Sequence, residues 1–268
     1  MRTRWDWRAG TRGALPVILV TLAMLAGAGC SQVFGPTEPD ANWRAHDRGR
    51  FTFYVRPGSF AEKHVDSFSE VLEDQYDYTV ATLSLRYNGR IFAFLYDSAA
   101  DARCQFDRSG TAYPDTEAIN VVCTGPLDAN LYWLLAHEAN HVIIRNGMGR
   151  PGTTFINEGL ASAVISERYH RLGRQLLLAW TRTQAATIPP LASLVDDSRW
   201  SDFDSDVSYK SSASFLAYLL DVHGLARLRQ LYNVPSKDFA RRFEQTYGQS
   251  LERVEADWQR FCSGRTNW

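Results

Sequence analysis

The residues best suited to chemistry are the five from His137 to His141, which read His-Glu-Ala-Asn-His. Side chains four positions apart lie on the same face of a helix, so the imidazoles of His137 and His141 can reach one metal ion. Glu138 then lies beside that ion without having to bind it. In the H-E-x-x-H pattern two histidines bind zinc and the glutamate acts as a general base. The spacing therefore predicts a zinc site, provided that the segment is helical and a third ligand exists.

The residues around this motif predict a helix. Residues 127–146 contain neither Pro nor Gly, Asp128 is a candidate N-cap, and Gly147 stands where a helix commonly ends. Apolar residues recur with helical spacing at Leu131, Leu134, Leu135, Val142 and Ile143. The alternative is that both histidines are core residues satisfied by their neighbours. Two histidines at metal-binding spacing, with a carboxylate between them, favour the metal site.

Glu158 is the best candidate for a third ligand, since catalytic zinc commonly has three protein ligands and one open position. It follows the turn-forming residues Gly149-Arg150-Pro151-Gly152, so a second helix that contains Glu158 can return against the first. We expect this helix to run to about Tyr169. The alternative is that Glu158 is a charge near the start of a helix, stabilised by the helix dipole. The preceding histidine motif favours the ligand.

Together, the HEANH motif and the separate Asn157-Glu158-Gly159 helix resemble the gluzincin clan of metallopeptidases, in particular the bacterial peptidase MA-like superfamily. The segments Ile188–Leu194 and Tyr209–Leu219 resemble the downstream loop and helix of that group. The resemblance covers roughly residues 50–262. It implies that His137, His141 and Glu158 bind one Zn²⁺ and that Glu138 is the catalytic carboxylate.

One residue departs from the family pattern. Many gluzincins have an aspartate four positions after the ligand glutamate, hydrogen-bonded to a ligand histidine, whereas this chain has Ser162. An acid in that position orients the imidazole and makes it more basic. With a hydroxyl in place of the acid, we expect the histidine to hold the metal less tightly unless another acid takes over this role. This departure keeps an alternative function open: a non-catalytic envelope lipoprotein that uses a peptidase-like fold to bind a protein partner.

If the zinc site forms, its chemistry is the hydrolysis of a peptide or protein substrate. Zinc lowers the pKa of its bound water, and Glu138 can accept a proton from that water and pass it to the departing amine. The oxyanion needs a further donor, for which Tyr209 is the first candidate and His223 the second. Each residue also has an alternative structural role. Tyr209 could be an aromatic side chain that packs in the core, and His223 could be a cation near the carboxyl end of a helix.

The amino terminus predicts export. Residues 1–29 carry Arg2, Arg4, Arg8 and Arg12, followed by an apolar run at 14–29 that is too short to span a membrane comfortably. Small residues before Cys30 resemble a bacterial lipoprotein cleavage site, which implies lipidation of Cys30 and attachment to the cell envelope. By the same resemblance, Ser31 after the cysteine favours the outer membrane, facing the periplasm. The alternative is ordinary signal cleavage, with Cys30 as a free or disulfide-bonded thiol.

Net charge bears on possible partners, and the cysteine count agrees with an exported protein. The 29 basic and 30 acidic residues give a net charge of -1, so charge offers no case for nucleic-acid binding. Cys104 and Cys123 flank an irregular, polar segment that a disulfide between them would close. Cys262 would then be unpaired, although it could instead pair with either of the two.

The pattern of elements predicts an α+β fold, in which a small mixed sheet packs on the motif helix and a mostly helical part follows. We expect a signal peptide at 1–29, a tether at 30–49, the two parts of one peptidase domain at 50–126 and 127–262, and a tail at 263–268. Strands are predicted at 51–55, 91–96 and 118–122. Besides the two site helices, helices are predicted near 60–83, 172–183, 211–223, 225–232, 237–247 and 251–262.

Overall fold

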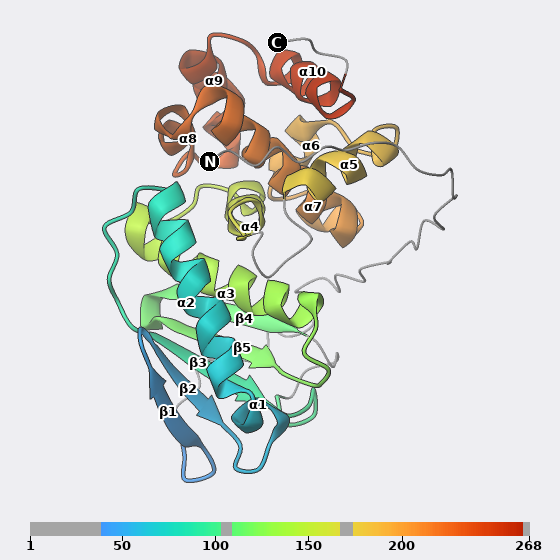
Figure 1. Cartoon of the computed structure of the whole chain (residues 1–268). Coiled ribbons are helices and arrows are strands. Elements are labelled where there is room, and N and C mark those ends of the chain that lie inside the picture. Colours follow the sequence, from blue (N-terminus) through green and yellow to red (C-terminus); the bar gives the residue numbers. More distant parts are fainter. Residues whose placement is uncertain (1–38, 103–108, 167–173, 265–268) are drawn as a thin grey trace, which may run out of the picture.

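A five-stranded mixed sheet forms one end of the described molecule, and helices form the other (Figure 1). The structure, a computed structural model, describes residues 39–102, 109–166 and 174–264. The strands are β1 (Arg44–Arg48), β2 (Phe51–Val55), β3 (Ile91–Tyr96), β4 (Gly110–Tyr113) and β5 (Ala118–Val122). They lie in the order β1-β2-β3-β5-β4, with β2, β3 and β5 parallel and the two outer strands antiparallel to their neighbours. The predicted α+β fold is confirmed.

The sequence predicts the three central strands but not the two outer ones. β2, β3 and β5 coincide with the predicted strands, and most of their residues are buried. β1 is largely exposed and β4 is half-buried along its whole length, so neither shows the alternation of a strand with one buried face. β1 also lies within the segment 30–49 that the sequence predicts to be a tether.

The single helix predicted for residues 60–83 is divided at His64 into α1 (Phe60–Lys63) and α2 (Val65–Thr82). In a continuous helix the backbone N–H of His64 would donate to the carbonyl oxygen of Phe60. Instead, the ring nitrogen Nδ1 of His64 lies 2.8 Å from that oxygen, and the backbone N–H donates to Ala61. A local side-chain contact thus replaces a helical hydrogen bond, which apolar periodicity does not reveal.

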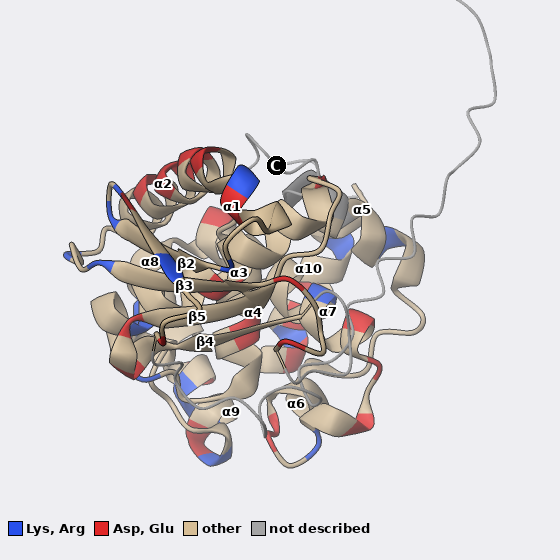
Figure 2. Ribbon diagram, turned by 90° about the horizontal axis from the view of Figure 1, so that it is seen from below, with Lys and Arg blue, Asp and Glu red and all other residues tan. Residues whose placement is uncertain are grey.

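Helices α2 and α3 (Ala129–Met148) lie side by side against the sheet (Figure 1). Fully buried Phe51 and Phe53 of β2 and Phe68 of α2 belong to the main core at this interface. Burying one such side chain contributes about 1.5–3 kcal/mol. At the surface, Arg48 pairs with Asp66 at 2.8 Å, and positive and negative residues are interspersed over the elements (Figure 2).

Helix α4 (Thr154–Ala163) lies between α3 and the C-terminal helices (Figure 1). The remaining α-helices are α5 (Arg174–Gln184), α6 (Leu191–Val195), α7 (Ser205–Tyr218), α8 (Leu225–Leu231), α9 (Ser236–Tyr247) and α10 (Leu251–Cys262). Short 3-10 segments occur at Pro114–Thr116 and Trp200–Asp202, and a π-helical segment, Leu219–His223, follows α7. In the part of the chain that the structure describes, no helix is long and apolar enough to cross a membrane.

Helices α4 and α7 approach each other closely because Gly159 has no side chain. A Cβ atom at this position would lie 2.8 Å from Ser212 Cβ and 2.9 Å from the Ser212 carbonyl carbon. Carbon atoms in contact normally lie about 3.5–4.0 Å apart, so no larger residue fits without movement of a helix. This close contact brings the first turns of α7, which carry Tyr209, toward Glu158.

Candidate metal centre

The motif residues lie in the middle of a long, buried helix, as the sequence predicts. Asp128 caps α3 by accepting hydrogen bonds from the backbone N–H groups of Asn130 and Leu131. The helix ends two residues beyond the expected position, at the cap residue Gly149, whose φ of 88° suits a residue without a side chain. His137 and His141 are 4% and 8% exposed, so their imidazoles are shielded from bulk water.

The second helix also forms and returns against the first. Thr153 caps α4 by accepting a hydrogen bond from the backbone N–H of Ile156 at 3.1 Å. Glu158 lies in the second turn of α4. The helix ends at its cap residue Val164, earlier than the predicted end near Tyr169. The first turns of α4 therefore present the Glu158 carboxylate to α3.

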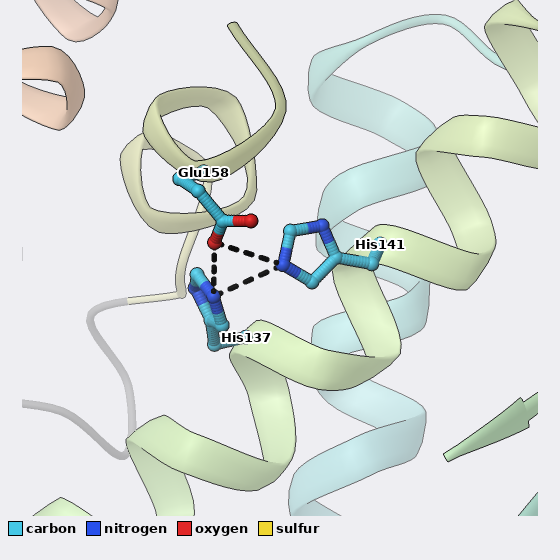
Figure 3. A group of neighbouring side chains, drawn as sticks. All are labelled: His137, His141 and Glu158. Atoms are coloured by element: carbon cyan, nitrogen blue, oxygen red, sulfur yellow. Dashed lines mark hydrogen bonds and ion pairs between the residues drawn. The ribbon is translucent and has the colours of Figure 1, made fainter. Parts of the chain in front are cut away.

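Three side-chain atoms converge at the centre of this arrangement (Figure 3). The Nε2 atoms of His137 and His141 are 3.0 Å apart, and they lie 3.2 Å and 3.3 Å from Oε2 of Glu158. Such separations suit atoms that share one ion at bond lengths of about 2.0–2.2 Å, and two imidazoles with one carboxylate are a common zinc donor set. The three predicted ligands therefore form a group that could hold a metal ion.

Neighbouring polar groups orient two of the three donors. The hydroxyl oxygen of Ser162 lies 3.1 Å from Nδ1 of His137, the ring nitrogen that is turned away from Glu158. The side-chain amide of Asn157 donates to Oε1 of Glu158 at 3.0 Å, which leaves Oε2 directed at the histidines. Outer contacts of this kind fix the orientation and tautomer of metal ligands.

The electrostatics of the donor group favour a positive charge between its members. Burial opposes the ionisation of Glu158, but His141 and His137 outweigh it and lower the pKa of this carboxyl below its ordinary value. Burial acts against a charge on His141 too, yet the Glu158 carboxylate outweighs it and raises the pKa of His141. For His137, burial lowers the pKa. A site that stabilises a proton beside a carboxylate is also suited to a divalent cation.

Glu138 is buried next to the donor group and is the residue expected to act as the base. Its side chain is 6% exposed, and burial raises the pKa of its carboxyl to about 7. A carboxyl with a pKa near the working pH is well matched to accepting and returning a proton. The position and the electrostatics of Glu138 therefore suit general acid-base chemistry.

The structure brings Tyr209 to the donor group but not His223. The ring centroids of Tyr209 and His137 lie 6.2 Å apart, and the pKa of the Tyr209 hydroxyl is raised by burial and by the neighbouring Glu158 and Glu138 carboxylates. His223 lies in the π-helical segment, where its ring packs on Tyr218 and Tyr247 with centroids 5.6 Å and 5.1 Å away. Of the two predicted oxyanion donors, only Tyr209 lies beside the donor group.

Two residues that the sequence analysis missed contact the site. The indole of Trp133 stacks on the His137 imidazole, with centroids 4.8 Å apart and an interplanar angle of 18°. The four-residue spacing on α3 is a signal that could have revealed this contact. Gly110, the first residue of β4, lies so close to Glu138 that a Cβ atom there would be 2.6 Å from Glu138 Cγ. The contact between Gly110 and Glu138 arises from the packing of β4 against α3, so no local sequence pattern reveals it.

The predictions for the cysteines lie partly outside the described residues. Cys30, the predicted lipidation site, and Cys104, one half of the predicted disulfide, fall in this category. Cys123 is buried directly after β5. Cys262 is buried at the end of α10, where its sulfur lies 4.0 Å from the Ser214 hydroxyl. Lipidation and the Cys104–Cys123 disulfide stay predictions.

No protein-family model matches this chain, and no curated protein matches it. The fold and the side-chain geometry therefore carry the assignment. They define an α+β protein with a buried His137-His141-Glu158 group that could hold a metal ion and with an adjacent buried glutamate, Glu138.

Proposed function

We propose that this protein is a zinc metallopeptidase of the bacterial cell envelope. The observation that carries the proposal is the convergence of His137 Nε2, His141 Nε2 and Glu158 Oε2 within 3.3 Å of one another. A purely structural ion pair would require neither two buried histidines around one carboxylate oxygen nor a neighbouring buried acid such as Glu138. The gluzincin resemblance of the HEANH and Asn-Glu-Gly segments supports the same function.

Zinc held by these three residues would supply a Lewis acid and would bring the pKa of water toward neutrality. Glu138 would accept the proton released from water and pass it to the departing amine. The hydroxyl of Tyr209, whose ring lies beside His137, would donate a hydrogen bond to the oxyanion. Trp133, stacked on His137, limits the access of water to one side of the imidazole.

The edge strand β4 provides a place for the substrate backbone. β4 is an outer strand of the sheet, and its first residue, Gly110, lies against Glu138. An extended peptide that adds to a sheet edge forms main-chain hydrogen bonds along it. A peptide paired with β4 would pass the Glu138 carboxyl, which supports a peptide or protein substrate rather than a small isolated molecule.

The cellular location is proposed from the amino-terminal sequence. Residues 1–29 would direct export, and lipid on Cys30 would attach the protein to the envelope, at the outer membrane facing the periplasm. The Cys30→Ser variant is expected to leave the membrane fraction, whereas retention of that variant on membranes would contradict lipid attachment. A nucleic-acid partner is not proposed, since the net charge is -1.

The serine at position 162 is the feature that keeps open the alternative of a non-catalytic, partner-binding lipoprotein. The Ser162 hydroxyl does contact His137, at 3.1 Å, so the residue occupies the orienting position despite its different chemistry. A hydroxyl that can orient the imidazole from this position supports the peptidase over the non-catalytic alternative.

The proposed activity is tested by comparing the wild-type protein with Glu138→Gln on a casein or peptide-library substrate in the presence of zinc. The variant keeps all three ligands but lacks a proton acceptor, so it is expected to bind zinc normally and to lose nearly all hydrolysis. A chelator should abolish the wild-type activity as well. Zinc-loaded wild type that cleaves no peptide, or hydrolysis unchanged by Glu138→Gln, would contradict the proposal.

A further inference from the structure

A buried hydrogen-bond network joins α2 to the two helices that carry the candidate metal ligands. Its central members are Gln75 and Thr79 of α2 and Asn140 of α3, each no more than 2% exposed. Asn140 is the fourth residue of the HEANH motif and is neither a ligand nor a base. Buried amides are costly unless they are hydrogen-bonded, so the contacts of these three side chains indicate what they contribute.

Both ends of the Asn140 carboxamide are engaged. Its Oδ1 accepts hydrogen bonds from Thr79 Oγ1 at 2.6 Å and from Gln75 Nε2 at 3.0 Å. Its Nδ2 donates to the backbone carbonyl of Ala161 at 2.7 Å. Asn140 thus connects α2 and α3 on one side and α3 and α4 on the other.

The contact with α4 falls at a position that matters for the metal centre. Ala161 lies between Glu158, the third candidate ligand, and Ser162, which contacts His137 at 3.1 Å. The hydrogen bond from Asn140 of α3 to this carbonyl constrains the position of α4 relative to α3. Because Glu158 is on α4 and both histidines are on α3, the relative position of these helices also determines the distance from Glu158 to the histidines.

Gln75 holds the end of the same helix. Its Nε2 lies 2.8 Å from the carbonyl oxygen of Val164, and its Oε1 accepts a hydrogen bond from the backbone N–H of Ser166 at 2.9 Å. Helix α4 has only 10 residues, and helices shorter than about 12–15 residues are marginal without tertiary contacts. The network therefore supplies α4 with contacts in its last turn, directly after the Glu158 position.

We propose that Asn140, supported by Gln75, is a positioning residue that locks α4 against α3 and so sets the reach of Glu158 and Ser162 to the two histidines. This inference rests on the metal site of the proposed function, but it concerns a residue that touches neither metal nor substrate. Ligand groups must be held to within about 0.5 Å for tight binding, and a hydrogen-bonded backbone contact next to the ligand provides that constraint.

The test compares Asn140→Leu, which is similar in size but cannot form hydrogen bonds, with the control Ser214→Ala. Ser214 is equally buried and accepts from Thr181 at 2.8 Å and from Trp258 at 3.1 Å, in a separate network of the helical part. Zinc affinity of the full chain is measured by competition with a chelator, and the absorption spectrum of the Co²⁺-loaded protein reports the ligand geometry.

Both variants are expected to lower the melting temperature, but only Asn140→Leu should weaken zinc binding, by about 10-fold, and alter the Co²⁺ spectrum. Equal zinc affinity in Asn140→Leu and the wild type, or equal losses in Asn140→Leu and Ser214→Ala, would overturn the proposal. If Asn140→Leu does not fold, Gln75→Leu takes its place with the same two outcomes.

Hydrogen exchange in the metal-free chain separates this inference from the proposed function. The α4 amides should exchange faster in Asn140→Leu or Gln75→Leu than in Ser214→Ala, whether or not the wild type binds zinc. If the α4 amides exchange faster in these variants but the wild type binds no zinc, the proposed function is contradicted. The proposal that Asn140 positions α4 against α3 is then still supported. Equal exchange of the α4 amides in all variants would contradict the positioning role of Asn140 and Gln75.

Discussion

The hydroxyl oxygen of Ser162 lies 3.1 Å from Nδ1 of His137. The other ring nitrogen of His137, Nε2, lies 3.2 Å from Glu158, so each nitrogen has its own partner on α4. If Nε2 binds a metal, the proton of the neutral imidazole is on Nδ1. The Nδ1–H group then donates a hydrogen bond to the Ser162 oxygen. A neutral hydroxyl can therefore orient the imidazole, although it adds less basicity than a carboxylate would.

Removal of this hydroxyl should weaken metal binding without unfolding the protein. We expect Ser162→Ala to lower the zinc affinity by about 10-fold, because the His137 ring loses the contact that fixes its tautomer. A chelator competition titration measures the change. Ser59→Ala is a matched control, since Ser59 is similarly buried but caps α1 by accepting from the Glu62 backbone N–H. Equal zinc affinities for the two variants would contradict an orienting role for Ser162.

Loss of the Tyr209 hydroxyl should act on catalysis rather than on metal content. In Tyr209→Phe we expect kcat to fall by about 10²-fold, the usual effect of removing one oxyanion donor, with KM and bound zinc nearly unchanged. His223→Gln serves as the comparison, because His223 packs against Tyr218 and Tyr247 and not against the ligands. Steady-state kinetics decide between the two residues, and a larger loss in His223→Gln would reverse the assignment.

A side chain at position 110 should displace the Glu138 carboxyl, the proposed general base. In Gly110→Ala the new Cβ would lie 2.6 Å from Glu138 Cγ and 2.7 Å from Oε1, so either Glu138 or β4 must move. Misplacing a reacting group by about 1 Å can cost about 10²-fold in rate. We expect turnover to fall while zinc content stays at the wild-type level.

The control for this variant is Gly89→Ala, whose Cβ would meet the side chains of Glu117 and Tyr87, outside the metal centre. That substitution also forces a carboxylate to move, yet it should leave turnover unchanged. Comparable activity in Gly110→Ala and Gly89→Ala would show that the closeness of β4 to Glu138 has no catalytic importance.

The contact between α4 and α7 predicts a loss of stability in Gly159→Ala. Its Cβ would lie 2.8 Å from Ser212 Cβ and 2.9 Å from a backbone carbon of α7, which a side-chain rotation cannot relieve. Overpacking of this kind costs about 1–3 kcal/mol. Urea unfolding measures the change in the free energy of unfolding. A variant as stable as the wild type would indicate that α7 adjusts freely, and that Gly159 does not set its position.

Local signals in the sequence were sufficient to predict the three candidate metal ligands and the helices that carry them. Asp128 and Thr153 cap the two site helices, and the turn between them lets Glu158 meet the histidines. These features depend on residues close together along the chain. The α+β fold followed from the same kind of evidence, because the central strands and most helices have clear apolar patterns.

Features that arise from tertiary packing were not predictable in this way. Gly110 contacts Glu138 only because the edge strand packs along α3, and β4 itself has no alternating pattern. Asn140 reaches Gln75 across 65 residues of sequence, so its spacing in the motif reveals nothing about its partners. The contact of Ser162 with His137 was expected only from the family resemblance, because it depends on how α4 packs against α3.

The central claim is that His137, His141 and Glu158 bind one metal ion, and metal analysis of the purified full chain tests it most directly. We expect one Zn²⁺ per wild-type chain after zinc loading and buffer exchange, and little or none in His137→Ala, His141→Ala or Glu158→Ala, each confirmed as folded by circular dichroism. A folded wild-type protein that retains no metal with all three ligands intact would contradict the account.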